Sequence, residues 1–150
     1  MGSLSAAVDV RCQWEVDRSP FEKAVFGKNQ MTARTDGCLR ANNGEVFAIA
    51  EVKPNARNRA KRPELLWQET GEMITWFMHD ISVERNRLQP RRLLVSQDNH
   101  AIYLTLASVN GPYIEYLQTG LVPTEPLRAE DSRPIPPFLK MQQYGPWKIL

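Results

Sequence analysis

The dipeptide Asn43-Gly44 is the feature of this sequence that most constrains its fold. It lies between two β-type segments within residues 31–53. Asn-Gly is the strongest short-range signal for a two-residue hairpin, because both positions of the tight turn need positive φ. The sequence therefore predicts an antiparallel hairpin centred on Asn43-Gly44.

The register of this hairpin brings charged residues together at its open end. With Asn43-Gly44 as the loop, Asp36 faces Glu51 and Arg34 faces Lys53. Residues two apart on a strand share a face, and Cβ atoms at opposed positions are about 5 Å apart. Two carboxylates at that separation repel each other, and sheet stability does not require them. A divalent cation would relieve the repulsion, since hard cations bind carboxylate oxygens.

The pattern Asp36, then Glu51-Val52-Lys53, resembles the motif of the PD-(D/E)XK nuclease superfamily, and the likeness extends over residues 31–108. Thr35 stands where that motif often has Pro. The resemblance implies an α/β (α+β) fold with a restriction-endonuclease-like core, in which helices flank a mixed sheet. On the residues alone an alternative stays open, namely an exposed hairpin with cross-strand ion pairs such as Arg34 with Glu51.

The resemblance also implies roles for these residues. Asp36 and Glu51 would bind Mg²⁺ or Mn²⁺, with the carbonyl of Val52 as a further ligand. Lys53 would orient or help to deprotonate an attacking water. A glutamine on the following helix, Gln68, would hold Lys53 or that water in place. The implied activity is metal-dependent hydrolysis of phosphodiester bonds in nucleic acid, with DNA favoured over RNA as the partner.

Residues 63–80 give the clearest helix pattern, and Pro63 suits its first position. One apolar stripe is expected to face the core, and it comprises Leu65, Leu66, Trp67, Met73, Ile74, Trp76 and Phe77. A second stripe is polar and is expected to face solvent except at Gln68; it comprises Gln68, Glu72, Thr75 and His79.

The N-terminal segment is expected to be helical. Val8, Cys12 and Val16 recur at four-residue spacing, and Ser19-Pro20 could begin a second short helix. In the PD-(D/E)XK superfamily a helix before the hairpin often contributes a glutamate to the metal site. Glu15 and Glu22 are the candidates here, and each can equally be a solvated helix charge.

The C-terminal half is expected to add strands to the sheet. The expected elements are a strand at 91–97, a turn at 98–99, a strand at 100–107, a turn at 110–112, a strand or short helix at 113–117, a proline-rich connector at 121–137, and a tail at 138–150 whose helical character Gly145-Pro146 interrupts.

Length and composition fit one globular domain, with 150 residues, 42% apolar and 24% charged. Two cysteines make neither a disulfide framework nor a zinc site. No secretory signal or membrane-length apolar run is visible, so an intracellular protein of the nucleus or cytoplasm, with no membrane partner, is expected. A homo-oligomer or a further domain beyond this sequence stays open.

A second functional hypothesis is a catalytically inactive domain of the same fold that binds nucleic acid or protein. Inactive members of such a family usually lose an acid or the lysine. This sequence keeps Asp36, Glu51 and Lys53, which favours the enzyme.

Four basic residues just after Lys53 are expected to bind nucleic acid, together with Arg34; they are Arg57, Arg59, Lys61 and Arg62. Replacing these four by Ala should weaken binding and flatten its salt dependence by roughly one unit of slope for each lost phosphate contact. Titration of DNA at several salt concentrations measures both quantities. Unchanged binding and slope would identify the segment as a solvated connector.

Overall fold

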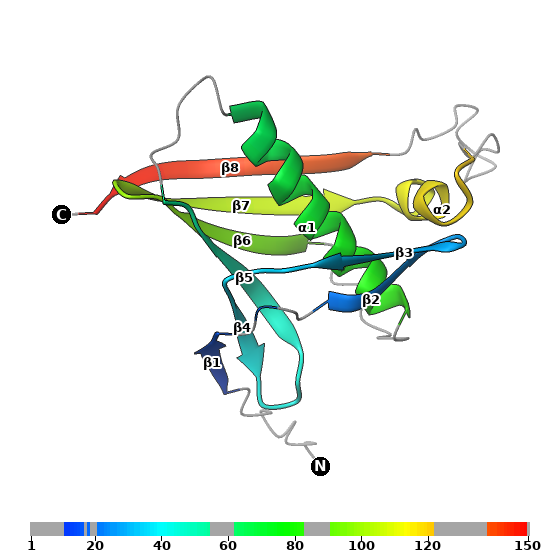
Figure 1. Ribbon diagram of the computed structural model, residues 1–150, viewed down its shortest axis with the longest axis horizontal. Coiled ribbons are helices and arrows are strands. Elements are labelled where there is room, and N and C mark those ends of the chain that lie inside the picture. Colours follow the sequence, from blue (N-terminus) through cyan, green and yellow to red (C-terminus); the bar gives the residue numbers. More distant parts are fainter. Residues whose placement is uncertain are drawn as a thin grey trace, which may run out of the picture.

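The computed structural model describes residues 11–16, 18, 21–54, 62–82, 91–121 and 138–149, without the side chains of residues 22, 23, 62 and 82. Within these residues the chain has an α+β fold, with a mixed six-stranded sheet, a two-stranded sheet and two helices (Figure 1). The elements in chain order are β1 (Cys12–Glu15), β2 (Phe21–Phe26), β3 (Asn29–Ala33), β4 (Gly37–Ala41), β5 (Val46–Val52), α1 (Arg62–Ser82), β6 (Arg91–Gln97), β7 (Ala101–Val109), α2 (Gly111–Thr119) and β8 (Leu139–Lys148).

The large sheet has the strand order β1-β4-β5-β6-β7-β8. Its neighbouring strands are antiparallel except β5 and β6, which are parallel. Parallel neighbours need a long crossover connection, usually a helix, and α1 lies in this one. The carboxyl ends of β5 and β6 consequently lie at the same edge of the sheet, where open sheets with parallel strands bind ligands.

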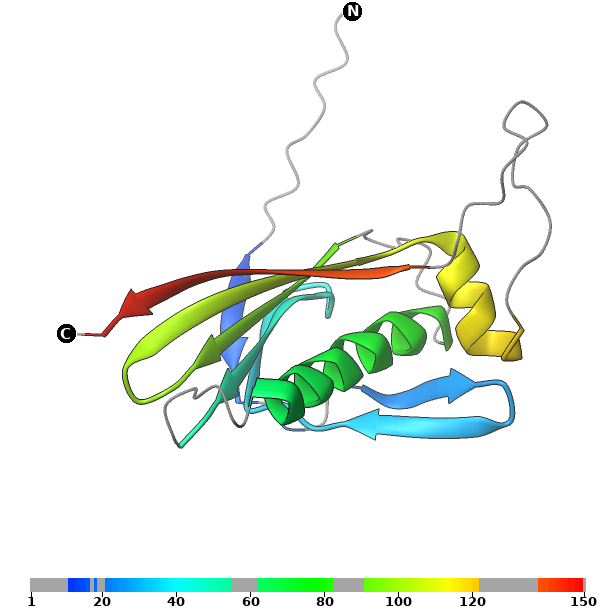
Figure 2. The same ribbon diagram turned by 90° about the horizontal axis from the view of Figure 1, so that it is seen from above.

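Helix α1 covers one face of the large sheet, and the β2–β3 ribbon lies on the same side (Figure 2). The predicted helix at 63–80 is thus confirmed. Its side chains Met73, Trp76 and Phe77 pack with Ile49 of β5 and Leu94 of β6 in a common core. No helix in the described ranges has the length and apolar content needed to cross a membrane.

The predicted hairpin is formed by β4 and β5, and its register at the open end is the predicted one. Cys38 pairs with Ile49, and Leu39 pairs with Ala48. The turn itself differs from the prediction, because Ala41 donates its N–H to Glu45 and the loop therefore has one residue more than expected. A register shift follows between Leu39 and the next pair, so that one residue of β5 is bulged. The extra loop residue shifts the pairing by one position, and the bulged residue shifts it back, so that the pairs beyond the bulge keep the predicted register.

Two expectations about the hairpin are wrong. The ladder does not reach Arg34, because β4 begins at Gly37 and the preceding segment forms β3 in the second sheet. The small side chains of Ala48 and Ala50 would let a helix pack closely, which predicts a helix on their face, but α1 packs on the opposite face, which carries Ile49. The larger apolar side chains lie on that face, so burying it stabilises the fold more.

The expected N-terminal helices are strands. Residues 12–15 form β1, which pairs with β4, and residues 21–26 form β2, which pairs with β3. Apolar and polar residues alternate in β1, a period-2 pattern typical of a strand. Gly27, with φ of 58°, lies in the turn from β2 to β3 and supplies the positive φ that a tight hairpin needs. Only three apolar residues recurred at four-residue spacing, and so short a pattern was too little to identify a helix.

The C-terminal elements partly follow the prediction. Strands β6 and β7 confirm the expected pair, and residues 111–119 form α2, whose N-cap is Asn110. The tail forms strand β8 on the outer side of β7, contrary to the helical expectation. Gly145-Pro146 falls where the β7–β8 register shifts, and a bulge on an edge strand tolerates proline. The connector at 122–137 lies outside the described residues.

Close packing at Gly37 gives a test of the β1–β4 pairing. A Cβ atom there would lie 2.9 Å from the carbonyl oxygen of Glu15, so Gly37→Ala should lower the free energy of unfolding by about 1–3 kcal/mol. Gly111→Ala is the matched control, since its Cβ would meet nothing within 4 Å. Urea unfolding measures both. A Gly37→Ala variant as stable as the wild type would contradict this packing of β1.

Candidate active site

Charged side chains gather at the carboxyl end of β5, beneath the N-terminal half of α1. Glu51 is the sixth residue of β5, and Lys53 follows the strand directly. The parallel register continues past β5, since Lys53 donates its N–H to the carbonyl of Gln97 at 2.7 Å. This backbone bond holds Lys53 beside the end of β6 and fixes the direction of its side chain.

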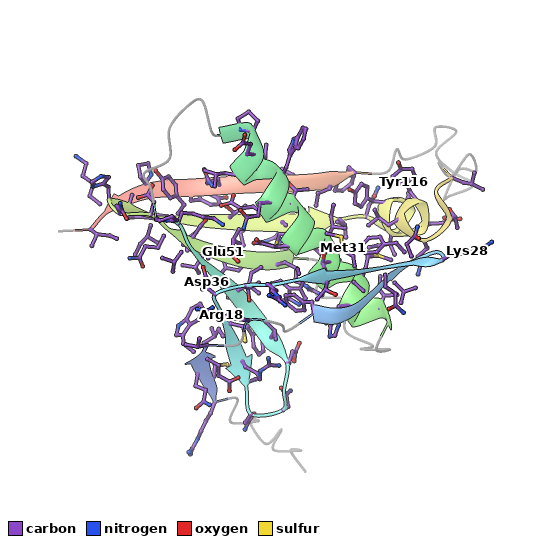
Figure 3. The ribbon with its side chains drawn as sticks, in the orientation of Figure 1. Arg18, Lys28, Met31, Asp36, Glu51 and Tyr116 are labelled. Carbon is purple, nitrogen blue, oxygen red and sulfur yellow. The ribbon has the colours of Figure 1, made fainter. Side chains whose placement is uncertain are left out.

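Asp36 lies beside Glu51 at this edge (Figure 3). The N–H of Asp36 bonds to the carbonyl of Ala50 at 3.0 Å, although Ala50 is the register partner of Gly37, so the predicted register ends at Gly37 and does not extend to Asp36. Its Oδ2 accepts the N–H of Val52 at 2.7 Å. Val52 is the neighbour of Glu51 in β5, so this bond holds the carboxylate of Asp36 close to Glu51.

Glu51 and Lys53 form a buried ion pair. The Nζ of Lys53 lies 3.0 Å from Oε2 of Glu51, and both residues are buried. Removing either partner of such a pair would leave the other charge uncompensated in the protein interior. The ion pair therefore stabilises the charged form of Lys53 and holds its ammonium group beside Glu51.

Helix α1 adds two buried glutamates to the same region. Glu69 accepts a hydrogen bond from Oγ of Ser96 at 2.9 Å, and Ser96 is the β6 residue paired with Glu51. Glu72, one turn further along α1, accepts a bond from the Nε2 of Gln68 at 3.0 Å. Glu51 of β5 thus faces two further carboxyl groups across the sheet–helix interface.

The pKa values of this cluster are shifted upward. The pKa of Glu72 is raised to about 8, by burial first and by the charge of Glu51 second, against the smaller opposing effects of Gln68 and Lys53. Burial also raises the pKa of Glu51, while Lys53 lowers it and the charge of Asp36 raises it. At neutral pH Glu72 therefore holds a proton in the metal-free protein.

Glu51 and Glu72 are linked to each other in this cluster. Their oxygens Oε1 of Glu51 and Oε2 of Glu72 are buried and receive no hydrogen bond from another described residue. The two side chains hydrogen-bond with each other, and the proton that Glu72 holds supplies the donor that two carboxylates would lack.

The donors present are consistent with a magnesium-type site. Among the described residues, no group of three or more His, Cys, Asp or Glu side chains is placed to hold a metal ion. The set at the end of β5 is instead Asp36, Glu51 and the backbone carbonyl of Val52. Mg²⁺ commonly binds through one or two carboxylates and keeps several waters, so these residues fit that ion.

The other predicted site residues are less closely associated with this cluster. Gln68 is exposed and contacts Glu72, whereas a contact with Lys53 or with the attacking water was expected. Glu15 pairs with Arg40 at 3.0 Å on strands β1 and β4, contrary to its expected place on a helix. Arg34 is exposed between β3 and β4.

Several predicted residues cannot be placed. Arg57, Arg59 and Lys61 lie outside the described residues. Arg62 is the first residue of α1 and Glu22 lies in β2, but their side chains are not among those described. The expected roles of these five residues remain predictions.

Sequence reasoning missed Glu69 and misjudged Glu72. The latter belongs to the stripe expected to face solvent, yet it is only 5% exposed, and Trp67 of the expected apolar stripe is 78% exposed. A signal existed in the helical spacing. Glu69 lies four residues before Met73, Glu72 lies four residues before Trp76, and both of those apolar positions are buried. The sheet beneath this half of α1 ends in polar residues, so the buried stripe of the helix is polar there too.

Comparison of the chain with protein-family models, with curated proteins and with solved structures found no match.

The raised pKa of Glu72 predicts how stability depends on pH. The unfolded chain releases this proton near the ordinary value of 4.5 and the folded chain releases it near 8. Between these values the folded state binds more protons, so the free energy of unfolding should fall as pH rises. Glu72→Gln stays neutral and should lose this fall, which makes it more stable than the wild type near pH 8 by an amount on the order of a few kcal/mol.

Urea unfolding with EDTA at several pH values measures this difference. Glu115→Gln, on an exposed position of α2, controls for the loss of one negative charge. If Glu72→Gln and the wild type lose stability equally as pH rises, Glu72 does not carry the proton.

Proposed function

We propose that this chain is a nuclease-like domain with a restriction-endonuclease-like core, and that it hydrolyses phosphodiester bonds of nucleic acid with the help of Mg²⁺ or Mn²⁺. The observation that carries the proposal is the group formed by Asp36, Glu51 and Lys53. An aspartate bound to the backbone of β5, a buried glutamate and a lysine 3.0 Å from that glutamate occupy one sheet edge.

The topology supports this proposal. The antiparallel strands β4 and β5, the helix α1 and the parallel strand β6 follow one another in the chain. Glu51 stands at the carboxyl end of β5, beside the parallel strand β6, and this end is the usual ligand position in sheets of this kind. These features agree with the resemblance of Asp36 and the Glu51-Val52-Lys53 segment to the PD-(D/E)XK motif.

Asp36, Glu51 and the carbonyl of Val52 would hold the cation. Such a cation would supply Lewis-acid chemistry, polarising a phosphate oxygen and lowering the pKa of water. Hydrolysis would form a bond from the water oxygen to phosphorus and break one phosphorus–oxygen ester bond, and a proton from the water would end on the alcohol that leaves.

The side chains of this protein have separable tasks in that reaction. The Val52 N–H fixes the orientation of Asp36. Lys53 brings a positive charge with three donors beside the acids, where it can orient the water and stabilise negative charge that develops on phosphate oxygens. The backbone bond from Lys53 to Gln97 keeps this charge in position before substrate arrives.

Lys53→Met should separate chemistry from folding. Methionine preserves much of the buried side-chain volume and removes the charge. Mg²⁺-dependent cleavage of DNA should therefore fall by about 100-fold or more, while circular dichroism should still report a folded protein. Lys28→Met, on the exposed turn between β2 and β3, is the matched control and should cleave like the wild type.

The cleavage assay should compare single- and double-stranded DNA and RNA, each with Mg²⁺, Mn²⁺ or EDTA. Full activity of Lys53→Met would remove the role given to this lysine. A wild type that cleaves none of these substrates would contradict the proposed function and favour the inactive nucleic-acid- or protein-binding domain.

A further inference from the structure

Three polar side chains lie side by side on strands β6, β7 and β8. Arg91 of β6 pairs with Ser108 of β7, and Ser108 pairs with Lys140 of β8. Residues that face each other across a sheet share one face, so the three form a single row across the strands. We call these three residues the basic row.

The chain neighbours of the basic row show which face of the sheet it occupies. Arg92 packs on the ring of Trp76 in α1, and Ala107 belongs to the core beneath that helix. Met141 accepts a hydrogen bond from Thr70 of α1. Adjacent residues on a strand point to opposite faces, so the basic row points away from α1, which lies on the other side of the sheet (Figure 2).

A pocket of about 270 Å³ borders the basic row. Leu106, Gln142 and Tyr144 also line it. Gln142 and Tyr144 follow Lys140 on β8 at spacings of two residues, which keeps all three on one face. The side chain of Tyr144 is 42% exposed. The pocket therefore has hydrogen-bond donors at one end and an aromatic ring at the other.

The two cations of the basic row are not neutralised by the protein. In the part of the chain that the structure describes, neither Arg91 nor Lys140 takes part in an ion pair, and no acidic residue lines the pocket. The next residue of β6 differs, since Arg92 pairs with Asp80 at 2.7 Å. Like charges repel, and an anion bound between them would relieve that repulsion.

We propose that this pocket binds a nucleotide, with its phosphate on the basic row and its base against Tyr144. The guanidinium of Arg91 can donate two parallel hydrogen bonds to phosphate oxygens, the hydroxyl of Ser108 can donate one, and Lys140 adds a compact positive charge. A planar base stacks on an aromatic ring, as in proteins that bind single-stranded nucleic acid. A free nucleotide and one unit of a single strand present the same phosphate and base.

This pocket is separate from the candidate active site. Arg91 is the first residue of β6, whereas Ser96, which pairs with Glu51, lies near the other end of that strand. Ser96 also faces α1, since it donates a hydrogen bond to Glu69. The two sites thus lie at opposite ends and on opposite faces of the sheet, and this inference does not rest on the proposed function.

Calorimetric titration of the full chain with AMP in EDTA tests the inference without a metal ion. Arg91→Gln combined with Lys140→Gln should weaken AMP binding by about 10-fold or more, because the charge-assisted bonds to phosphate are lost. Arg18→Gln combined with Lys28→Gln is the matched control. It removes two exposed positive charges elsewhere and should bind AMP like the wild type. Tyr144→Leu should weaken binding of AMP but not of inorganic phosphate.

Two further measurements keep the result clear if a variant does not fold. Thermal melts report folding for each variant. Nuclear magnetic resonance of the wild type needs no variant, because AMP should shift the backbone amide signals of Arg91, Ser108 and Lys140.

Titration with single-stranded oligothymidylate in EDTA distinguishes the two sources of the ligand. Binding of the oligonucleotide that is tighter than that of AMP, and that the Arg91/Lys140 double variant weakens, identifies one unit of a single strand. Binding no tighter than that of AMP identifies a free nucleotide.

The inference is overturned if the wild type binds neither AMP nor the oligonucleotide, or if the Arg91/Lys140 double variant binds both as tightly as the wild type. Adenosine that binds as tightly as AMP would contradict the role of the basic row. Inorganic phosphate that binds as tightly as AMP would contradict the role of Tyr144. The proposed function fails separately, because it depends on metal-dependent cleavage and on Lys53.

Discussion

The parallel pairing of β5 with β6 determines most of what surrounds the candidate site. Since these strands run in the same direction, the chain must cross from one end of the sheet to the other, and α1 lies in that crossover. The pairing sets Glu51 beside Ser96 and holds Lys53 against Gln97. The same helix that fills the core with Trp76 and Phe77 therefore also brings carboxyl groups over the ends of both strands.

The two halves of α1 bury different kinds of side chain. Its C-terminal half buries large apolar side chains and stabilises the fold through the hydrophobic effect. Its N-terminal half buries Glu69 and Glu72 and exposes Trp67. Stability alone does not explain the second arrangement, because well-packed apolar side chains would cost less to bury than carboxyl groups. The polar half of the interface is thus the part of the molecule that most clearly needs a functional explanation.

The sequence predicted the elements whose signals are local and repeated. Asn43-Gly44 located the hairpin, and the long apolar period located α1. The pairs from Gly37 to Leu39 follow the expected register, although through a longer loop and a bulge that no sequence pattern indicated, and Asp36 bonds to Ala50 instead of pairing with Glu51. The N-terminal strands escaped prediction, because β1 has only four residues and gains its order from pairing with β4.

Side-chain burial on α1 was harder to predict for a different reason. A helical wheel identifies stripes but not the surface that each stripe will meet. Glu72 is buried because the sheet below it ends in Glu51 and Ser96, which is a property of the tertiary fold. Likewise, the partner of Gln68 is Glu72, which could be recognised only once the helix was set on the sheet.

The bulge in β5 also limits how this hairpin can change during evolution. Alternation along a strand has a period of two, so deleting one turn residue would shift β5 by one position and direct Glu51 away from α1. Deleting a turn residue together with the bulged residue would restore the register. Loop length and bulge should therefore vary together among related sequences, and the hairpin should accept insertions or deletions in compensating pairs rather than singly.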